Sequence, residues 1–258
     1  MNKNKTPLKI LKIGGQVFEN QDDFFQLIRA FAAWDNPKIL VHGGGKKAST
    51  MAQQLGIEPK MYNGRRITDD ATLEVVVMVY AGWINRKIVS RLQSLECNAL
   101  GMTGADLNSI EAHKRIVKEV DFGWAGDIDK VDNQMLQKVL ELEITPVFCA
   151  ITHDKKGQLL NTNADTIAAS LAAALSIRYE VSLHYCFDRP GVLLDASDDT
   201  TVIKELSFER YEQYKAEGII ADGMLPKLDN AFDSLRKGVS EVVLGGVQNL
   251  GNGTKIKM

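Results

Sequence analysis

An alternation of strand-like and helical segments predicts an α/β fold, a three-layer αβα sandwich with a mainly parallel central sheet. Two observations carry this prediction. Short apolar runs end in glycine, and stretches with apolar residues at three- and four-residue spacing follow them. In addition, no change of composition along the 258 residues marks a flexible linker. We therefore expect one domain over residues 1–258, with approximate lobes over residues 1–175 and 176–258.

The first predicted strand, residues 9–13, contains Lys12 and ends in Gly14 and Gly15, before a helix over residues 22–33. Because glycine has no Cβ, its backbone N–H groups can approach a ligand closely. One such loop alone could equally be a structural turn.

The second predicted strand, residues 39–42, ends in Gly43, Gly44 and Gly45 and runs into a helix over residues 46–55. The positive dipole end of that helix faces the same loop. Two glycine loops, each with a lysine, therefore predict a site for an anionic ligand, most simply phosphate plus carboxylate.

The longest predicted helix begins at the cap Thr68-Asp69-Asp70 and continues to about Leu95. Its apolar stripe consists of Leu73, Val77, Tyr80, Ile84, Ile88, Leu92 and Leu95, and a second set consists of Val76, Val79 and Trp83. One interpretation is that one face packs on the sheet and the other on a partner subunit. The alternative is one broad buried face within a monomer.

The remaining pattern predicts a glycine-bent hairpin around residues 121–126. Further helices are expected over residues 133–142, 166–175, 208–217 and 225–236, and further strands over residues 145–151, 181–187, 241–244 and 254–257.

Composition excludes several classes of protein. A net charge of −2 gives no electrostatic case for nucleic acid or an acidic membrane surface. The three cysteines form no C-x-x-C pair, which favours reduced thiols over a disulfide framework or a zinc site. The polar N-terminus and the lack of a long apolar run predict a soluble, cytoplasmic protein without a membrane segment.

Familiar catalytic motifs are also missing from the sequence. Lys47 follows Gly45-Lys46 where a Walker A motif requires Ser or Thr, and no G-x-G-x-x-G follows a strand. The four histidines lack metal-ligand spacing, so no metal-ligating residues are predicted. For His42, beside the glycine loop, we expect a role in orienting that loop rather than in acid–base catalysis.

The chain resembles the amino-acid kinase family, and within it the acetylglutamate kinases. The matching pieces are Lys12-Ile-Gly14-Gly15, Val41-His42-Gly43-Gly44-Gly45, Asn63-Gly64-Arg65-Arg66-Ile-Thr68, Gly157-Gln-Leu-Leu-Asn161-Thr-Asn163-Ala-Asp165 and Asp222-Gly223-Met224-Leu-Pro-Lys227. They follow the family order and span almost the whole chain. The resemblance implies ATP-dependent phosphorylation of the γ-carboxylate of N-acetyl-L-glutamate in arginine biosynthesis, with Mg²⁺ held mainly by phosphates and water. It also assigns acyl-glutamate binding to the first lobe and ATP binding to the second.

The resemblance further implies residue roles. Lys12 and Lys227 would neutralise the transferring phosphoryl group, and Asp165 would hold both ammonium groups in place, besides capping the following helix. Gly14 and Gly15 would donate backbone N–H groups to phosphate.

On the acceptor side, Gly44 and Gly45 would bind the substrate together with Arg66, a bidentate clamp for the α-carboxylate, and Asn161, near its α-amide.

The nucleotide would lie over the second lobe. The turn containing Asp188, Gly191 and Leu193 would line the adenosine site, and Ile219 and Ile220, with Ala221, would form an apolar wall beside the base. Arg189 and Pro190 depart from the family pattern within that turn.

Other interpretations remain open. Arg65 and the Lys46-Lys47 pair make the acceptor loop basic, through solvated charge or because the acyl group carries its own carboxylate, as in N-succinylglutamate. A catalytically silent nucleotide-binding protein on the same fold is another alternative, although retention of Lys12, Asp165 and Lys227 disfavours it. Only about eight residues precede the first strand, from which we expect a homodimer built on the long helix, without arginine feedback.

Overall fold

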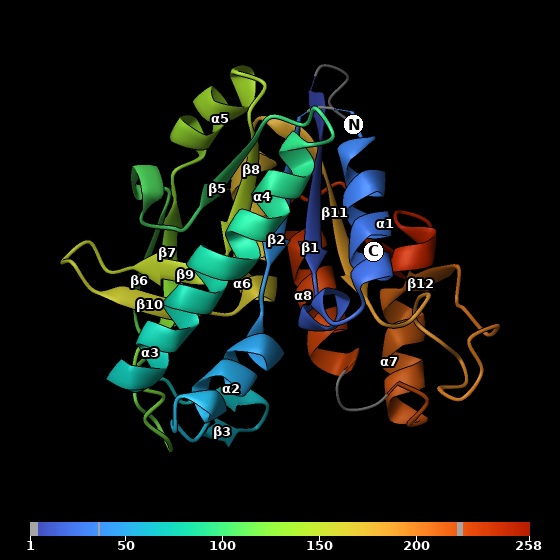
Figure 1. Cartoon of the computed structure of the whole chain (residues 1–258). Helices are drawn as coiled ribbons and strands as arrows, with labels where there is room; N and C mark the ends of the chain where they lie inside the picture. Colours follow the sequence, from blue (N-terminus) through green and yellow to red (C-terminus); the bar gives the residue numbers. More distant parts are fainter. Residues whose placement is uncertain (1–4, 36, 221–223) are drawn as a thin grey trace. The chain divides into compact units, whose positions relative to one another are not determined.

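The computed structural model describes residues 5–35, 37–220 and 224–258 and divides the chain into two compact units (Figure 1). Unit 1 comprises residues 1–39 and 168–258, and unit 2 comprises residues 40–167. Both combine mainly parallel strands with helices, which confirms the predicted α/β class. No helix in the described ranges is both long enough and apolar enough to span a bilayer.

Unit 1 has the strand order β12-β14-β13-β11-β1. These strands are β1 (Thr6–Ile13), β11 (Tyr179–Phe187), β12 (Glu205–Ser207), β13 (Glu241–Gly246) and β14 (Thr254–Lys257). Strands β1, β11 and β13 are parallel, and β14 runs antiparallel to β13. Because the three parallel strands end at the same edge, the register brings Ile13 opposite Cys186, and Cys186 opposite Gly245.

The helical segments of unit 1 are η1 (Gly15–Phe18), α1 (Gln21–Ala32), α7 (Phe208–Ala216), α8 (Leu225–Arg236) and η5 (Val247–Asn249). Asn20 caps α1, because its side chain accepts hydrogen bonds from the backbone of Asp22 and Asp23. Helix α8 packs against β13 and β14 through an apolar face that includes Leu228 and Phe232, both fully buried. Lys227 therefore lies in the first turn of a helix whose position is fixed by its buried apolar face.

Unit 2 contains a parallel set in the order β2-β8-β5 and a small closed barrel in the order β10-β7-β6-β9. The parallel strands are β2 (Lys38–His42), β5 (Ala99–Met102) and β8 (Thr145–Cys149). The barrel strands are β6 (Ile110–Lys114), β7 (Ala125–Val131), β9 (Ile151–His153) and β10 (Leu159–Thr162), and a short hairpin consists of β3 (Met61–Tyr62) and β4 (Arg65–Arg66).

The helices that begin in unit 2 are α2 (Gly45–Gln54), α3 (Asp70–Val77), α4 (Asn85–Gln93), η3 (Asp106–Asn108), α5 (Asn133–Glu141) and α6 (Ala164–Leu175). Helix α4 packs across β5 and β8 (Figure 1). Every residue of β2 and β8 is buried, as expected for parallel strands covered by helices.

The long predicted helix is not uniform. Helices α3 and α4 are joined by a π-helical segment, η2 (Met78–Ile84). The predicted stripe is largely confirmed, since Leu73, Tyr80, Ile84, Ile88 and Leu92 are buried. Trp83, however, is 63% exposed and Met78 is 53% exposed, so a single broad buried face does not account for the whole segment.

Three local predictions differ from the structure. The expected strand over residues 145–151 is two strands, β8 and β9, which belong to different sheets. The expected bend at residues 121–126 lies at the end of a longer connection between the antiparallel strands β6 and β7. Strands β3, β4, β5, β10 and β12 were not predicted, because two to four residues are too few for a period-two pattern to stand out.

Candidate active site

A cavity of about 680 Å³ opens in unit 1 at the carboxyl ends of the parallel strands. It brings together five residues predicted from the sequence, namely Lys12, Gly14, Gly15, Asp188 and Lys227. Its remaining lining consists of Val17, Asp23, Phe187, Arg189, Pro190, Asp199, Gly246, Val247, Gln248 and Asn249. Two lysines from segments 215 positions apart in sequence therefore line one cavity, where both can contact an anionic ligand.

The backbone at the end of β1 is fixed by the neighbouring strand. Gly14 N–H donates to the Cys186 carbonyl over 3.1 Å. A Cβ added at Gly14 would lie 3.6 Å from that carbonyl oxygen, an ordinary contact. This loop is therefore held in place without being crowded.

The opposite wall is formed by residues 188–190 together with the segment after β13. Asn249 joins them, because its side-chain oxygen accepts from Gly246 N–H at 2.9 Å and its side-chain nitrogen donates to the Pro190 carbonyl at 2.7 Å. Arg189 forms an ion pair of 2.9 Å with Asp199. The sequence predicted Asp188 in this wall, but it did not assign Asn249 or Asp199 to the site.

The other predicted nucleotide residues lie elsewhere in unit 1, outside the described lining of that cavity. Gly191 packs tightly, since a Cβ there would lie 2.7 Å from Val202 and 2.8 Å from Thr254. Leu193 pairs with Val202 in an isolated bridge. Ile220 is buried and Ile219 is 36% exposed. Ala221, Asp222 and Gly223 lie outside the described residues.

The glycine loop of unit 2 gathers side chains from three elements around Arg66. Arg66 Nη2 donates to the Gly45 carbonyl at 2.8 Å and to Ser49 Oγ at 2.7 Å. Arg66 Nη1 is buried without a hydrogen-bond acceptor. The hydroxyl group of Tyr80 lies beside the same guanidinium group. The sequence predicted Arg66 and Gly45 here, but it assigned no role at this site to Ser49 or Tyr80.

Gly44 is crowded. A Cβ at this position would overlap Ile84 Cδ1 and would lie 3.0 Å from the Tyr80 ring. Glycine is required there by the close approach of the long helix, and the backbone of the loop consequently reaches the surface of η2.

His42 orients this loop, as predicted. Its Nδ1–H donates to the Gly43 carbonyl at 2.8 Å, and its Nε2 accepts from Asn85 Nδ2 at 3.1 Å. Asn85 Nδ2 also donates to the Val147 carbonyl at 2.8 Å, so the network fixes the neutral tautomer. Burial lowers the pKa of His42 from 6.5 to about 4. The imidazole is therefore neutral at physiological pH.

Asn161, on β10, donates to Thr68 Oγ1 at 3.0 Å, and its own backbone N–H donates to the Trp124 carbonyl. Thr68 N–H and carbonyl bond in turn to Phe122 and Trp124 on either side of Gly123. Gly123 has φ of +63°, and a Cβ there would overlap the Thr68 carbonyl. The segment 122–124 thus ties the end of the β3–β4 hairpin to the barrel strand that carries Asn161.

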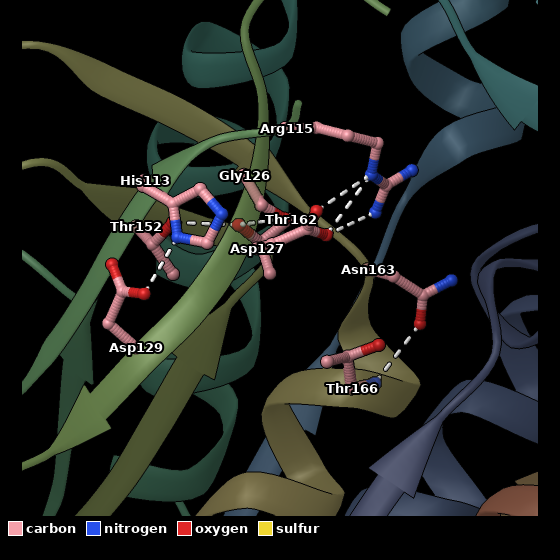
Figure 2. A network of polar contacts seen from close by, with 9 residues as sticks. All are labelled: His113, Arg115, Gly126, Asp127, Asp129, Thr152, Thr162, Asn163 and Thr166. Atoms are coloured by element: carbon pink, nitrogen blue, oxygen red, sulfur yellow. Dashed lines mark hydrogen bonds and ion pairs between the residues drawn. The ribbon is translucent and has the colours of Figure 1, made fainter. Parts of the chain in front are cut away.

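The barrel supports the motif that follows Asn161 (Figure 2). Thr152 and Thr162 share a buried hydrogen bond of 2.7 Å between their hydroxyl groups, and Arg115 forms a bidentate ion pair with Asp127. Asn163 caps α6, since its side-chain oxygen accepts from the backbone of Asp165 at 2.7 Å and Thr166 at 3.1 Å. The predicted capping role of Asp165 is therefore wrong, and this carboxylate lies in the first turn of α6 instead.

The cysteines and the metal-ligating residue types form no cluster among the described residues. The three cysteines are buried single thiols, and burial raises the pKa of Cys149 and of Cys186 to about 12. Across residues 5–35, 37–220 and 224–258 no group of three or more His, Cys, Asp or Glu side chains could hold a metal ion.

Comparison with known proteins gives a consistent picture. Residues 7–246 match the model of the amino acid kinase family. The chain belongs to this family. It is 49% identical over 257 residues to an acetylglutamate kinase of Bacteroides fragilis, which covers 99% of this chain and 98% of the relative. An acetylglutamate kinase of Methanopyrus kandleri is 36% identical, covering 97% of this chain and 100% of the relative.

Solved structures show the same fold. A Streptococcus mutans protein superposes with a TM-score of 0.81 at 23% identity and covers 97% of this chain and 98% of its own. A carbamate kinase of Giardia lamblia bound to AMP-PNP gives a TM-score of 0.67 at 13% identity and covers 99% of each chain. The family resemblance and the fold expected from it are thus confirmed.

Proposed function

We propose that this protein transfers the γ-phosphoryl group of ATP to the γ-carboxylate of N-acetyl-L-glutamate, giving N-acetyl-L-glutamyl 5-phosphate in arginine biosynthesis. Near full-length similarity to acetylglutamate kinases supports the reaction. The observation that carries it in the structure is the cavity shared by Lys12 and Lys227. A silent nucleotide binder on this fold need not keep two lysines in that position together with Asp165.

In this reaction, an anionic carboxylate attacks an anionic phosphate, so the enzyme must hold the two groups in line and neutralise their charge. Lys12 and Lys227 would supply positive charge to the equatorial oxygens. Of the two glycines predicted to donate, only Gly15 would offer its backbone N–H group, because Gly14 N–H already donates to the Cys186 carbonyl. Asp165 would orient the two ammonium groups. Mg²⁺, held by phosphates and water, would neutralise further charge on the nucleotide.

The acceptor would be held in unit 2. Arg66 would form a bidentate pair with the α-carboxylate, and Asn161 would contact the α-amide region. The loop Gly44–Gly45 leads into α2, whose dipole favours an anion at its N-terminal end.

The nucleotide would extend from the 680 Å³ cavity along unit 1. Asp188 lines the cavity directly, and Gly191 and Leu193 continue its turn towards β14. Ile219 and Ile220 would provide an apolar surface for the adenine base.

The direct test is a substrate screen with ATP and hydroxylamine, which traps an acyl phosphate as a hydroxamate. N-acetyl-L-glutamate should give hydroxamate and ADP in equal amounts, whereas free glutamate should give little. No hydroxamate from any acylated glutamate would refute the proposal.

Within this screen, N-succinyl-L-glutamate is the substrate that distinguishes an acetyl from a succinyl acyl group. Arg65 is exposed on β4 beside Arg66, where it could meet a second carboxylate on the acyl group. A succinyl substrate that turns over faster than the acetyl substrate would assign the larger acyl group. Equal or faster acetyl turnover would leave Arg65 as solvated surface charge.

We further propose a cytoplasmic homodimer whose interface includes the exposed Trp83 and Met78 of η2. Sedimentation velocity should give a dimer for the natural chain and a monomer for Trp83→Glu. A natural chain that sediments as a monomer would contradict the dimer.

A further inference from the structure

We infer that Ser49 and Tyr80 are positioning residues that set the guanidinium group of Arg66 for the carboxylate of the acceptor. The inference rests on the proposed role of Arg66 as carboxylate clamp and goes beyond it, because it assigns the clamp's geometry to two further side chains.

The hydrogen bonds of Arg66 are divided unequally. Nη2 has two acceptors, the Gly45 carbonyl at 2.8 Å and Ser49 Oγ at 2.7 Å. Nη1 has none, although it is buried. A buried donor without an acceptor is unfavourable, and a bidentate carboxylate would satisfy it. The guanidinium group is therefore held in place through Nη2, and Nη1 lacks the acceptor that a substrate carboxylate would provide.

Ser49 supplies the side-chain part of this anchor. It lies in α2, one turn after Gly45, so its hydroxyl faces the same side of the helix as the glycine loop. Because the other acceptor is a backbone carbonyl, Ser49 is the contact of Nη2 that a side-chain substitution can remove.

Tyr80 restricts the position of the Arg66 guanidinium group from another side. The ring is 5% exposed, and burial raises the pKa of its hydroxyl group, so the group is neutral beside the Arg66 charge. A Cβ at Gly45 would lie 3.7 Å from the Tyr80 hydroxyl and 3.9 Å from Arg66 Nη2, which places both groups beside the glycine loop.

The position of Tyr80 in the π-helical segment η2 supports this assignment. π-Helical turns are rare and occur frequently at functional sites. The Tyr80 ring also lies against Gly44, so the same side chain contacts the loop and reaches the clamp. One aromatic residue thereby couples the long helix to the acceptor site.

The test compares steady-state kinetics of Ser49→Ala and Tyr80→Phe. Ser49→Ala should raise the KM for N-acetyl-L-glutamate about tenfold, the effect of losing one hydrogen bond to a charged group. Tyr80→Phe, which removes the neutral hydroxyl group beside the guanidinium group, should also raise this KM, and both variants should leave the KM for ATP unchanged. Ser90→Ala and Tyr214→Phe are matched controls, because they remove the same groups from α4 and α7, and they should change neither KM. Ser49→Thr, which keeps the hydroxyl, should restore most of the lost affinity.

A double-mutant cycle separates positioning from packing. In an Arg66→Ala background, Ser49→Ala and Tyr80→Phe should have no further effect on the acceptor KM, because they act through the guanidinium group. Addition of guanidinium ion should partly restore activity to Arg66→Ala but less to Arg66→Ala/Ser49→Ala. Persistence of either single effect without Arg66 would overturn the inference.

The outcomes also distinguish this inference from the proposed function. If Arg66→Ala raises the acceptor KM while Ser49→Ala and Tyr80→Phe do not, the clamp stands and the positioning roles are wrong. If Arg66→Ala leaves the acceptor KM unchanged, both the clamp and the positioning roles fall, whether or not the hydroxamate assay detects product.

Discussion

The two glycine loops, one at the end of β1 and one at the end of β2, have similar sequences and different physical surroundings. Gly14 lies at the edge of a cavity, and an added Cβ would meet only one carbonyl oxygen at a normal distance. Gly44 lies against Ile84 and Tyr80, where a Cβ would overlap neighbouring atoms. The same sequence signal thus marks a loop at a cavity edge in unit 1, for which we propose phosphate binding, and a packed loop in unit 2, for which we propose acceptor binding.

This difference shows that glycine serves two purposes in this protein. In unit 1 it lines a cavity without crowding its neighbours, whereas in unit 2 it admits a neighbouring helix. Substitutions in the first loop should therefore act on catalysis, and substitutions in the second should act first on stability.

The largest effect is expected for Lys12→Ala. Removal of a cation that stabilises transition-state charge typically lowers kcat by about 10²- to 10³-fold. The melting temperature should stay within about 2 °C of the natural chain, because Lys12 lines a cavity rather than the core. Lys204→Ala, an exposed lysine of the same unit, is the control. ATP turnover that survives Lys12→Ala unchanged would refute the catalytic role.

Gly44→Ala should destabilise the protein by about 1–3 kcal/mol, the usual cost of overpacking, whereas Gly14→Ala should change stability by less than about 0.5 kcal/mol. Urea unfolding of both variants measures the difference. Equal stability of the two variants would show that the two loops do not differ in how they tolerate an added Cβ.

The sequence predicted most of the parallel strands, most helices and five residues of the unit 1 cavity, because apolar periodicity and glycine-ended strands are local signals. It did not predict the closed barrel, whose strands are short and pair across distant segments. Ser49, Tyr80 and Asn249 were also missed, since their roles depend on contacts with residues 17, 14 and 59 positions away. Such contacts leave no pattern in a single sequence.

A smaller effect is expected from the two buried histidines, His42 in unit 2 and His184 in unit 1. Burial lowers the pKa of each from 6.5 to about 4. The unfolded chain therefore binds more protons between these values, and the free energy of unfolding decreases as the pH falls from about 6.5 to about 4. Each histidine contributes a slope of up to about 1.4 kcal/mol per pH unit.

Urea unfolding at pH 5 and pH 7 checks this dependence. His184→Gln should reduce the difference between the two pH values, and His42→Gln should reduce it similarly in the other unit. An unaltered difference in both variants would show that the histidines are not the titrating groups.

The smallest effect is expected for Asn163→Ala, which removes the cap of α6 and should cost about 1 kcal/mol. Asn163→Asp keeps the acceptor oxygen and should retain most of that stability. If Asn163→Asp lost more stability than Asn163→Ala, the capping role of Asn163 would be contradicted.

The proposed assignment of nucleotide binding to unit 1 and of acceptor binding to unit 2 is tested most directly by equilibrium binding. Calorimetric titrations of AMP-PNP and of N-acetyl-L-glutamate would be made against Lys227→Ala and Arg66→Ala. We predict that Arg66→Ala weakens acetylglutamate binding at least about tenfold, the loss of one charge-assisted contact, and leaves AMP-PNP within about twofold. Lys227→Ala should do the reverse. Arg66→Ala that weakens AMP-PNP while acetylglutamate binds unchanged would contradict the account.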